Sequence, residues 1–513
     1  MPHFSQSPFG QPDCEAEIEV FQETYQDLYF HLSPFNAEAI DKDNYLFIGR
    51  RGSGKSSLAH YLTFQQQMVG AHCIDVNEPA VLETVLRKMA SEVSTPIELS
   101  SHTVCRIWEF VIWSLVFEVF KGRNEAIEQA CVLKCEHQRP TLIVESILQK
   151  TVVPMLSNAT ESSIDQVESC LNSHSFEHAK KLVLEFAKEQ PIIVAIDTLE
   201  ERNSTENQAL LRVHAALIEC ASKFNTRFKN NGIHIETFIS AEIFPHLAES
   251  EISNTTKYIR NPIFLQWRPK PLLRLVAWRF FQFLDRNPIA GLEISEPTWD
   301  NYQDVKAKAW DPFFGTKIMS ARLHEEDSFA YVLRHTQLRP RQLVILCNTI
   351  AKRAASRVSF PTFHDEDIVE GVKSAEQILA TEILNSYSKI FPKVANIVRA
   401  LTRFPVLFKG KDLDRIASST ASEWPSGEYS PLRFKQILTE LGIVGRVRNK
   451  SDRFIDADFS YALDDTLFLR ESDDCVVHPM FFNKLSIDTR QDLIVFPFPD
   501  HPSFEEVQVK VMA

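Results

Sequence analysis

The chain has little glycine and no long apolar segment. Its 513 residues include 14 glycines, too few for a collagen-like or glycine-rich low-complexity protein. The most apolar segment, residues 107–120, is interrupted by Glu109 and Glu118, whereas a membrane-spanning helix needs about 18 apolar residues in a row. Residues 1–20 lack the basic and apolar regions of a secretory signal. We therefore expect a cytoplasmic protein that makes no contact with a membrane.

Positive charge is also scarce. Lysine and arginine number 55 against 68 aspartates and glutamates, which gives a formal net charge of −13. A field of this sign excludes non-specific coating of nucleic acid or anionic lipid by the whole chain, although it does not exclude a local basic patch. The nine cysteines are odd in number and scattered along the chain, which favours reduced thiols over a disulfide framework.

The remaining composition is that of a globular protein with several domains. Hydrophobic residues make up 44% of the chain, charged residues 24%, and phenylalanine alone occurs 37 times. Such a composition excludes global disorder. At roughly 150 residues per domain, the length predicts about three domains.

A glycine-rich loop lies between a short apolar run and a helical pattern. Residues 45–48 predict a buried strand, and residues 57–62 predict a helix. Between them, residues 49–56 (GRRGSGKS) fit the P-loop pattern G-x-x-x-x-G-K-[ST]. The predicted phosphate-binding residues are Gly49, Arg50, Arg51, Gly52, Ser53, Gly54, Lys55, Ser56 and Ser57.

The chemistry of phosphate binding explains these residue types. Gly49, Gly52 and Gly54 let the backbone turn its N–H groups toward phosphate oxygens, and the N-terminus of the helix favours the same anion. Lys55 can reach the β- and γ-phosphates of ATP, and the Ser56 hydroxyl can ligate Mg²⁺. A chance glycine-rich turn is disfavoured, because strand, loop and helix occur in the required order.

An acidic residue ends a second apolar run. Residues 192–196 (IIVAI) predict a strand covered on both faces, and Asp197 follows directly. Parallel α/β sheets place their ligands at the carboxyl ends of strands, so we expect Asp197 to help hold Mg²⁺. Glu200 or Glu201 could orient or deprotonate the attacking water, and the sequence does not choose between them.

Further strands and helices complete the expected domain. Residues 72–76, 233–240 and 263–267 predict strands, and residues 207–228 predict a helix. Strands that alternate with helices indicate a doubly wound parallel sheet of the α/β class. A long helical insertion is expected at about residues 78–185.

The two boxes and several later segments resemble a known family. The phosphate loop, the long gap and the box IDTLEE at residues 196–201 resemble those of additional-strand P-loop ATPases, more narrowly the STAND class and the related AAA+ origin-binding ATPases. Further landmarks similar to those of bacterial members are FISAEIF (238–244), LQW (265–267), RPRQ (339–342), GIVG (442–445) and VHPMF (477–481). The resemblance covers residues 40–490.

The resemblance implies further site residues. Ser240 takes the sensor-1 position, where the group often has arginine, and its hydroxyl can bond a water or the γ-phosphate without adding charge. Arg339 or Arg341 is the sensor-2 candidate, beside Pro340 in the first turn of a helix. The alternative for the two arginines is pairing with surface acids.

The resemblance also implies a division of the chain. It comprises an N-terminal segment (1–40), a P-loop ATPase core (41–268), a helical lid (269–378), a winged-helix-like domain (379–490) and a C-terminal tail (491–513). The winged-helix expectation rests on predicted helices at 391–404, 412–422 and 430–441, followed by predicted strands at 443–447, 453–461 and 475–478. The tail is a candidate for docking on a partner.

Two functions follow from the resemblance. The first is an ATPase that hydrolyses ATP slowly, self-associates and acts as a regulatory switch for a separate effector protein, in a bacterial setting such as anti-phage defence. The alternative is a DNA-acting ATPase of the origin-binding or loader type, whose basic hairpin contacts phosphates. That hairpin, residues 446–453, carries Arg446, Arg448, Lys450 and Arg453. A solvated hairpin or a packing module is favoured over DNA contact, because the preceding helix lacks a base-reading face.

Overall fold

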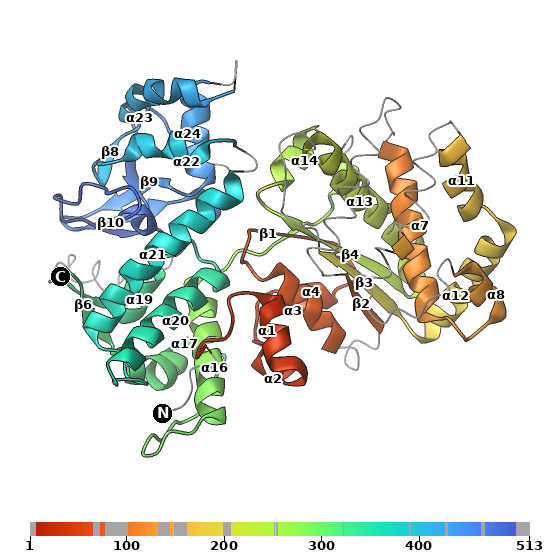
Figure 1. Cartoon of the computed structure of the whole chain (residues 1–513), viewed down its shortest axis with the longest axis horizontal. Coiled ribbons are helices and arrows are strands. Elements are labelled where there is room, and N and C mark those ends of the chain that lie inside the picture. Colours follow the sequence, from red (N-terminus) through yellow and green to blue (C-terminus); the bar gives the residue numbers. More distant parts are fainter. Residues whose placement is uncertain are drawn as a thin grey trace. The chain divides into compact units, whose positions relative to one another are not determined.

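The protein folds as two compact units, whose elements are labelled in Figure 1. The core unit is Pro34–Leu265, and the second unit combines Met1–Ser33 with Gln266–Ala513. The computed structural model describes residues 7–64, 72–76, 101–131, 144, 146–147, 162–197, 207–250, 252, 255–321, 323–388, 391–425, 429–462 and 467–498.

The core unit is built on a five-stranded parallel sheet of order β2-β3-β4-β1-β5. Its strands are β1 (Leu46–Gly49), β2 (His72–Val76), β3 (Ile192–Asp197), β4 (Ile233–Ser240) and β5 (Ile263–Phe264). They lie where the apolar runs predicted them, although β5 ends earlier than expected. The predicted parallel α/β sheet is thus confirmed.

Helices of the core unit surround this sheet (Figure 1). They are α3 (Asn36–Ile40), α4 (Lys55–Phe64), α7 (Ser101–Val119), α8 (Glu125–Ala130), α11 (Ser162–Leu171), α12 (His174–Glu189), α13 (Asn207–Phe228), α14 (Phe244–Ser250) and α15 (Thr255–Tyr258). Buried apolar residues of α7 and α13 pack with alternate residues of β3, namely Ile192, Val194 and Ile196. Helix α4 contacts strands β1 to β4 and so fixes the loop that precedes it to the sheet.

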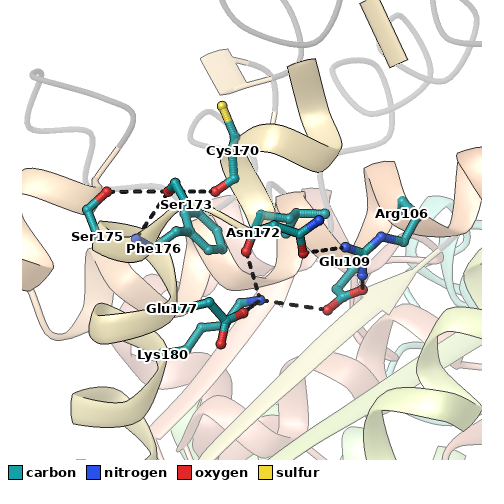
Figure 2. Close-up of polar contacts among 10 residues, drawn as sticks. Arg106, Glu109, Cys170, Asn172, Ser173, Ser175, Phe176, Glu177 and Lys180 are labelled. Carbon is teal, nitrogen blue, oxygen red and sulfur yellow. Dashed lines mark hydrogen bonds and ion pairs between the residues drawn. The ribbon is translucent and has the colours of Figure 1, made fainter. Parts of the chain in front are cut away.

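A buried lysine ties three helices of the expected insertion together (Figure 2). Lys180 of α12 is 7% exposed, and its Nζ donates to Glu177 Oε1 at 2.8 Å and to Leu171 O, in α11, at 3.4 Å. Glu109 of α7 lies 4.0 Å from the same ammonium. A buried charge needs such partners, so this network sets how α11 and α12 pack on α7. Other parts of the expected insertion, residues 77–100 and most of 132–161, lie outside the described residues.

The helices of the second unit enclose an aromatic core. They include α1 (Cys14–Phe21), α2 (Tyr25–Leu28), α16 (Pro269–Arg286), α17 (Tyr302–Val305), α18 (Asp311–Phe314), α19 (Ser328–Leu333), α20 (Pro340–Ser356) and α21 (Asp365–Tyr387). Phe280 of α16 contacts Phe313 and Phe363, and Trp310 stacks on Phe314 with ring centroids 3.7 Å apart. Helices thus occupy the segment expected to be helical, but it also holds a hairpin that the sequence did not predict, β6 (Lys317–Met319) with β7 (Glu325–Asp327).

The expected N-terminal segment 1–40 is divided between the two units: Met1–Ser33 belongs to the second unit, whereas residues 34–40, which include α3, belong to the core unit. Phe9 is fully buried and stacks on Phe280 with ring centroids 4.7 Å apart. Asn348 holds the backbone nearby, because its Nδ2 donates to Gly10 O at 2.9 Å and its Oδ1 accepts the Phe9 N–H at 3.1 Å. Glu17 is 2% exposed and pairs with Arg279 at 2.8 Å. These contacts between distant parts of the sequence hold the first part of the segment in the second unit.

The second unit ends in a five-stranded sheet of order β12-β10-β9-β11-β8. Its elements are α22 (Val394–Val398), β8 (Leu407–Lys409), α23 (Gly410–Ala417), α24 (Pro431–Glu440), β9 (Val444–Lys450), β10 (Phe454–Asp458), β11 (Asp474–Val477) and β12 (Ile494–Phe496). Ser430 caps α24 as predicted, accepting the Arg433 N–H at 3.0 Å. Strand β12 lies within the expected tail 491–513 and pairs in parallel with β10, so this part of the tail belongs to the sheet.

Two further properties concern the described residues alone. No described helix is long and apolar enough to cross a membrane. All seven cysteines with described side chains are free thiols: Cys14, Cys105, Cys131, Cys170, Cys220, Cys347 and Cys475.

Candidate functional site

The loop 49–56 joins β1 to α4 in a conformation that requires glycine. Gly52 and Gly54 have φ angles of 78° and 97°, a region that other residues enter only with strain. A Cβ built on Gly49 would lie 2.3 Å from Ser53 Oγ. The loop therefore has positive φ angles at Gly52 and Gly54, and the Ser53 side chain lies close to Gly49.

Lys55 lies folded across this loop. It begins α4, is 7% exposed, and its Nζ donates to Gly49 O at 3.0 Å. The Ser53 N–H donates to Arg50 O at 2.9 Å and closes the turn. The Lys55 ammonium therefore lies beside the first residue of the loop. From there it can donate its hydrogen bond to a phosphate oxygen in place of the Gly49 carbonyl. Ser57 follows in the first turn of α4 and is half-buried.

The two predicted magnesium ligands are in direct contact. Ser56, in the first turn of α4, donates its hydroxyl proton to Asp197 Oδ2 at 2.6 Å. Asp197 is the last residue of β3 and is 5% exposed. A hydroxyl and a carboxylate are oxygen ligands of the type that Mg²⁺ prefers, so the pair fits the cofactor that the sequence indicated. Glu200 and Glu201 lie outside the described residues, and the choice between them stays open.

A carboxylate that was not among the predicted site residues lies beside the loop and the end of β4. Glu242, 8% exposed, lies two residues beyond β4. Its Oε2 accepts the hydroxyl of Ser240 at 2.6 Å, and its Oε1 accepts the backbone N–H of Arg51, in the loop, at 3.1 Å. Strand pairing sets Ser240 opposite Gly49. The sequence did contain a signal for Glu242. It follows closely after a predicted strand, and parallel sheets bind their ligands at the carboxyl ends of strands.

A second buried acid lies on β4 but takes no part in these contacts. Glu236 is fully buried, and burial raises its pKa well above the usual range of a carboxyl group. Its Oε1 is 3.8 Å from His234 Nε2, which contacts Asn44 O at 2.8 Å. The step from Glu236 to Ser240 covers four residues of extended strand, a rise of about 13 Å. Glu236 therefore belongs to the interior of the sheet.

The two sensor-2 candidates have partners within the second unit. Arg341 donates through Nε to Pro12 O at 2.9 Å and pairs through Nη2 with Asp13 at 3.1 Å and through Nη1 with Glu382 at 3.5 Å. Arg339 is 4% exposed, and its Nη2 donates to Gln337 Oε1 at 2.8 Å. Arg341 thus holds the N-terminal segment on α20, which matches the alternative of pairing with acids. The sensor role stays a prediction for both residues.

Two of the four basic residues of the hairpin β9–β10, Arg446 and Arg448, pair with acids of the same hairpin. Arg448 donates through Nε to Asp456 Oδ2 at 2.7 Å, and Arg446 and Arg448 lie 3.6 and 3.5 Å from Asp458. Both side chains stay partly exposed, at 43% and 41%, and their pairing with acids reduces the positive charge available to DNA phosphates.

Comparison with protein-family models gives no match for this chain, and neither does comparison with curated proteins. No group of three or more histidine, cysteine, aspartate or glutamate side chains that could hold a metal ion occurs among the described residues. The geometry of the phosphate loop and the strand ends is therefore the basis on which a function can be proposed.

Proposed function

We propose that the protein is a P-loop ATPase of the additional-strand class, with ATP and Mg²⁺ as ligands. The observation that carries this proposal is the 2.6 Å hydrogen bond from Ser56 to Asp197. It joins the last residue of the loop motif to the acid that ends a second strand, as Mg²⁺ ligation in P-loop enzymes requires. The position of β4 between β1 and β3 supports the additional-strand class.

In this proposal each residue has a defined task. The backbone of residues 49–56 and Lys55 bind the phosphates, and Ser56 and Asp197 would hold Mg²⁺, which neutralises charge on the β- and γ-phosphates when bound. Glu200 or Glu201 orients the attacking water. Ser240 lies at the same strand edge as Asp197 and contacts the terminal phosphate or the water.

We propose further that ATP turnover operates a self-associating regulatory switch for a separate effector. The order β8-β11-β9 with the helices α22, α23 and α24 supports a winged-helix-like domain. The pairing of Arg446 and Arg448 with acids of the same hairpin favours a packing role. The DNA-acting alternative has less support for the same reason. The setting in anti-phage defence rests on the resemblance of the sequence alone.

The test is ATP binding and hydrolysis measured against protein concentration, with and without duplex DNA. Lys55→Ala should weaken ATP binding about 10- to 150-fold, because hydrogen bonds with charged groups contribute about 1.5–3 kcal/mol. Lys42→Ala, at an exposed lysine of the same unit, is the matched control and should leave affinity unchanged. Equal affinity of the wild type and Lys55→Ala for ATP would contradict the proposed phosphate-binding site.

The concentration series separates the two roles. A specific rate that rises with protein concentration and ignores DNA supports the self-associating switch. A rate that is flat with concentration and rises with DNA, together with a salt-sensitive DNA shift, supports the alternative instead.

A further inference from the structure

The end of β4 is joined to the phosphate loop at two points. The Ala241 N–H donates to Gly49 O at 3.0 Å, and the Arg51 N–H donates to Glu242 Oε1 at 3.1 Å. Lys55 Nζ donates to the same Gly49 carbonyl at 3.0 Å. The loop and the strand end are therefore coupled through both backbone and side chain.

We propose that Glu242 is the residue that senses the terminal phosphate, an inference that rests on the proposed ATPase function. In this structure its carboxylate holds the Arg51 N–H of the loop. The terminal phosphate of a nucleoside triphosphate then competes with the Glu242 carboxylate for the N–H groups of the loop. Binding of the triphosphate displaces the carboxylate.

Charge and hydrogen bonding both favour this competition. The inward N–H groups of such a loop are the donors to phosphate oxygens, and Glu242 Oε1 accepts one of the loop's N–H groups. A carboxylate with 8% exposure is poorly screened by solvent, so it repels a further anion placed beside it. A diphosphate carries less charge and is one phosphoryl group shorter, so it can bind while Glu242 keeps its place.

Displacement of Glu242 has a local consequence. Its other oxygen accepts the Ser240 hydroxyl at 2.6 Å, so its departure frees that hydroxyl for the phosphate or the attacking water. Helix α14 begins at Phe244, two residues further on, and packs against α13. The turn between β4 and α14 therefore changes conformation when the terminal phosphate is present. Through α14 this change can be transmitted to the rest of the core unit.

The deciding experiment compares the dissociation constants of Mg·ATP and Mg·ADP for the wild type and Glu242→Gln by calorimetry. Glutamine keeps an oxygen acceptor and the side-chain length but has no charge. We expect Glu242→Gln to bind ATP at least 10-fold more tightly and ADP within threefold of the wild type. Unchanged ATP affinity, or an equal gain for both nucleotides, would overturn the inference.

A matched control uses another buried glutamate of the core unit. Glu219 of α13 is 5% exposed and pairs with Lys223 at 3.4 Å. Glu219→Gln should leave both dissociation constants unchanged, since this pair lies within α13. A 10-fold gain in ATP affinity for this variant as well would show a general effect of charge and overturn the role of Glu242.

Two further readouts separate a sensing role from other roles. Single-turnover hydrolysis at saturating ATP should stay within about tenfold of the wild type in Glu242→Gln, whereas a loss of 100-fold or more would make Glu242 the general base instead. Hydrogen exchange needs no variant: in the wild type, ATP and not ADP should speed exchange in residues 241–250. Equal exchange with both nucleotides would contradict the proposal. A wild type that binds neither nucleotide would instead refute the proposed function itself, so the two failures are distinguishable.

Discussion

The hydroxyl of Ser56 and the carboxylate of Asp197 lie 2.6 Å apart although 141 positions separate them in the chain. Strand β3 ends at Asp197 and helix α4 begins at Lys55, one residue before Ser56. The parallel sheet thus brings the carboxyl end of one strand to the first turn of the helix that follows another. In the proposed site both residues would hold a divalent cation, Ser56 through its neutral hydroxyl oxygen and Asp197 through its carboxylate.

Asp197→Asn should remove the dependence of nucleotide binding on Mg²⁺. The amide keeps the shape and the acceptor for Ser56 but lacks the charge that holds the cation. We expect the wild type to bind ATP more tightly with Mg²⁺ than with a chelator, the variant to show less than a threefold difference, and turnover to fall about 100-fold. Calorimetry with and without Mg²⁺ measures this, with Asp41→Asn, at an exposed aspartate, as control. A fully retained Mg²⁺ effect in Asp197→Asn would count against the metal site.

Gly54→Ala and Gly122→Ala form a matched pair. Both glycines have positive φ, 97° and 84°, and an added Cβ would meet no atom within 4 Å at either position. Each alanine should therefore cost about 1–2 kcal/mol of stability through backbone strain. Only Gly54 lies in the phosphate loop, so only Gly54→Ala should also weaken ATP binding, by at least tenfold. Thermal unfolding and calorimetry together test this, and equal losses of affinity would show that the loop geometry is irrelevant to binding.

Phe9→Ala should release the N-terminal segment from the rest of the second unit. Phe9 is fully buried against Phe280, and truncation of a buried phenylalanine typically costs about 3–5 kcal/mol. We expect faster hydrogen exchange in α1 and α16 and little change in the core unit. Leu32→Ala, at a residue of the same segment that is 44% exposed, should change stability by less than about 1 kcal/mol. Unchanged exchange in α16 of Phe9→Ala would contradict the packing of Phe9 on Phe280.

Glu376 should make the second unit less stable as the pH rises. It lies 2.6 Å from His335 Nδ1 and accepts a hydrogen bond from Asn483. Burial raises the pKa of Glu376 to about 8 and lowers the pKa of His335 well below its usual range. The two groups therefore share one proton as a neutral pair near neutral pH.

The sign of the effect follows from linkage. Glu376 binds its proton more tightly in the folded than in the unfolded chain, so its stabilising contribution is complete below about pH 4.5 and is lost as the pH rises through its folded pKa of about 8. Across that range the wild type should lose roughly a few kcal/mol relative to Glu376→Gln, seen as faster hydrogen exchange in α21. If stability changed with pH in the same way in the wild type and in Glu376→Gln, the raised pKa of Glu376 would be refuted.

Much of the core unit could be predicted from local sequence. The runs at β1, β3 and β4 are continuous and apolar because both faces of a parallel sheet are covered, and their bounds lie within a residue or so of the expected ones. The glycines of the loop were equally clear, because only glycine enters its backbone conformations without strain. The proximity of Ser56 and Asp197 followed from the rule that strand ends share an edge.

The sequence by itself thus determined the elements and the chemistry of the loop, which depend on neighbouring residues. The tertiary structure decided which distant residues meet. Glu242 reaches Arg51 because β4 is inserted beside β1, and Arg341 is engaged by Pro12 and Asp13 because the N-terminal segment folds onto α20. Such contacts depend on strand order and on packing between segments hundreds of residues apart, and no local pattern of residues encodes them.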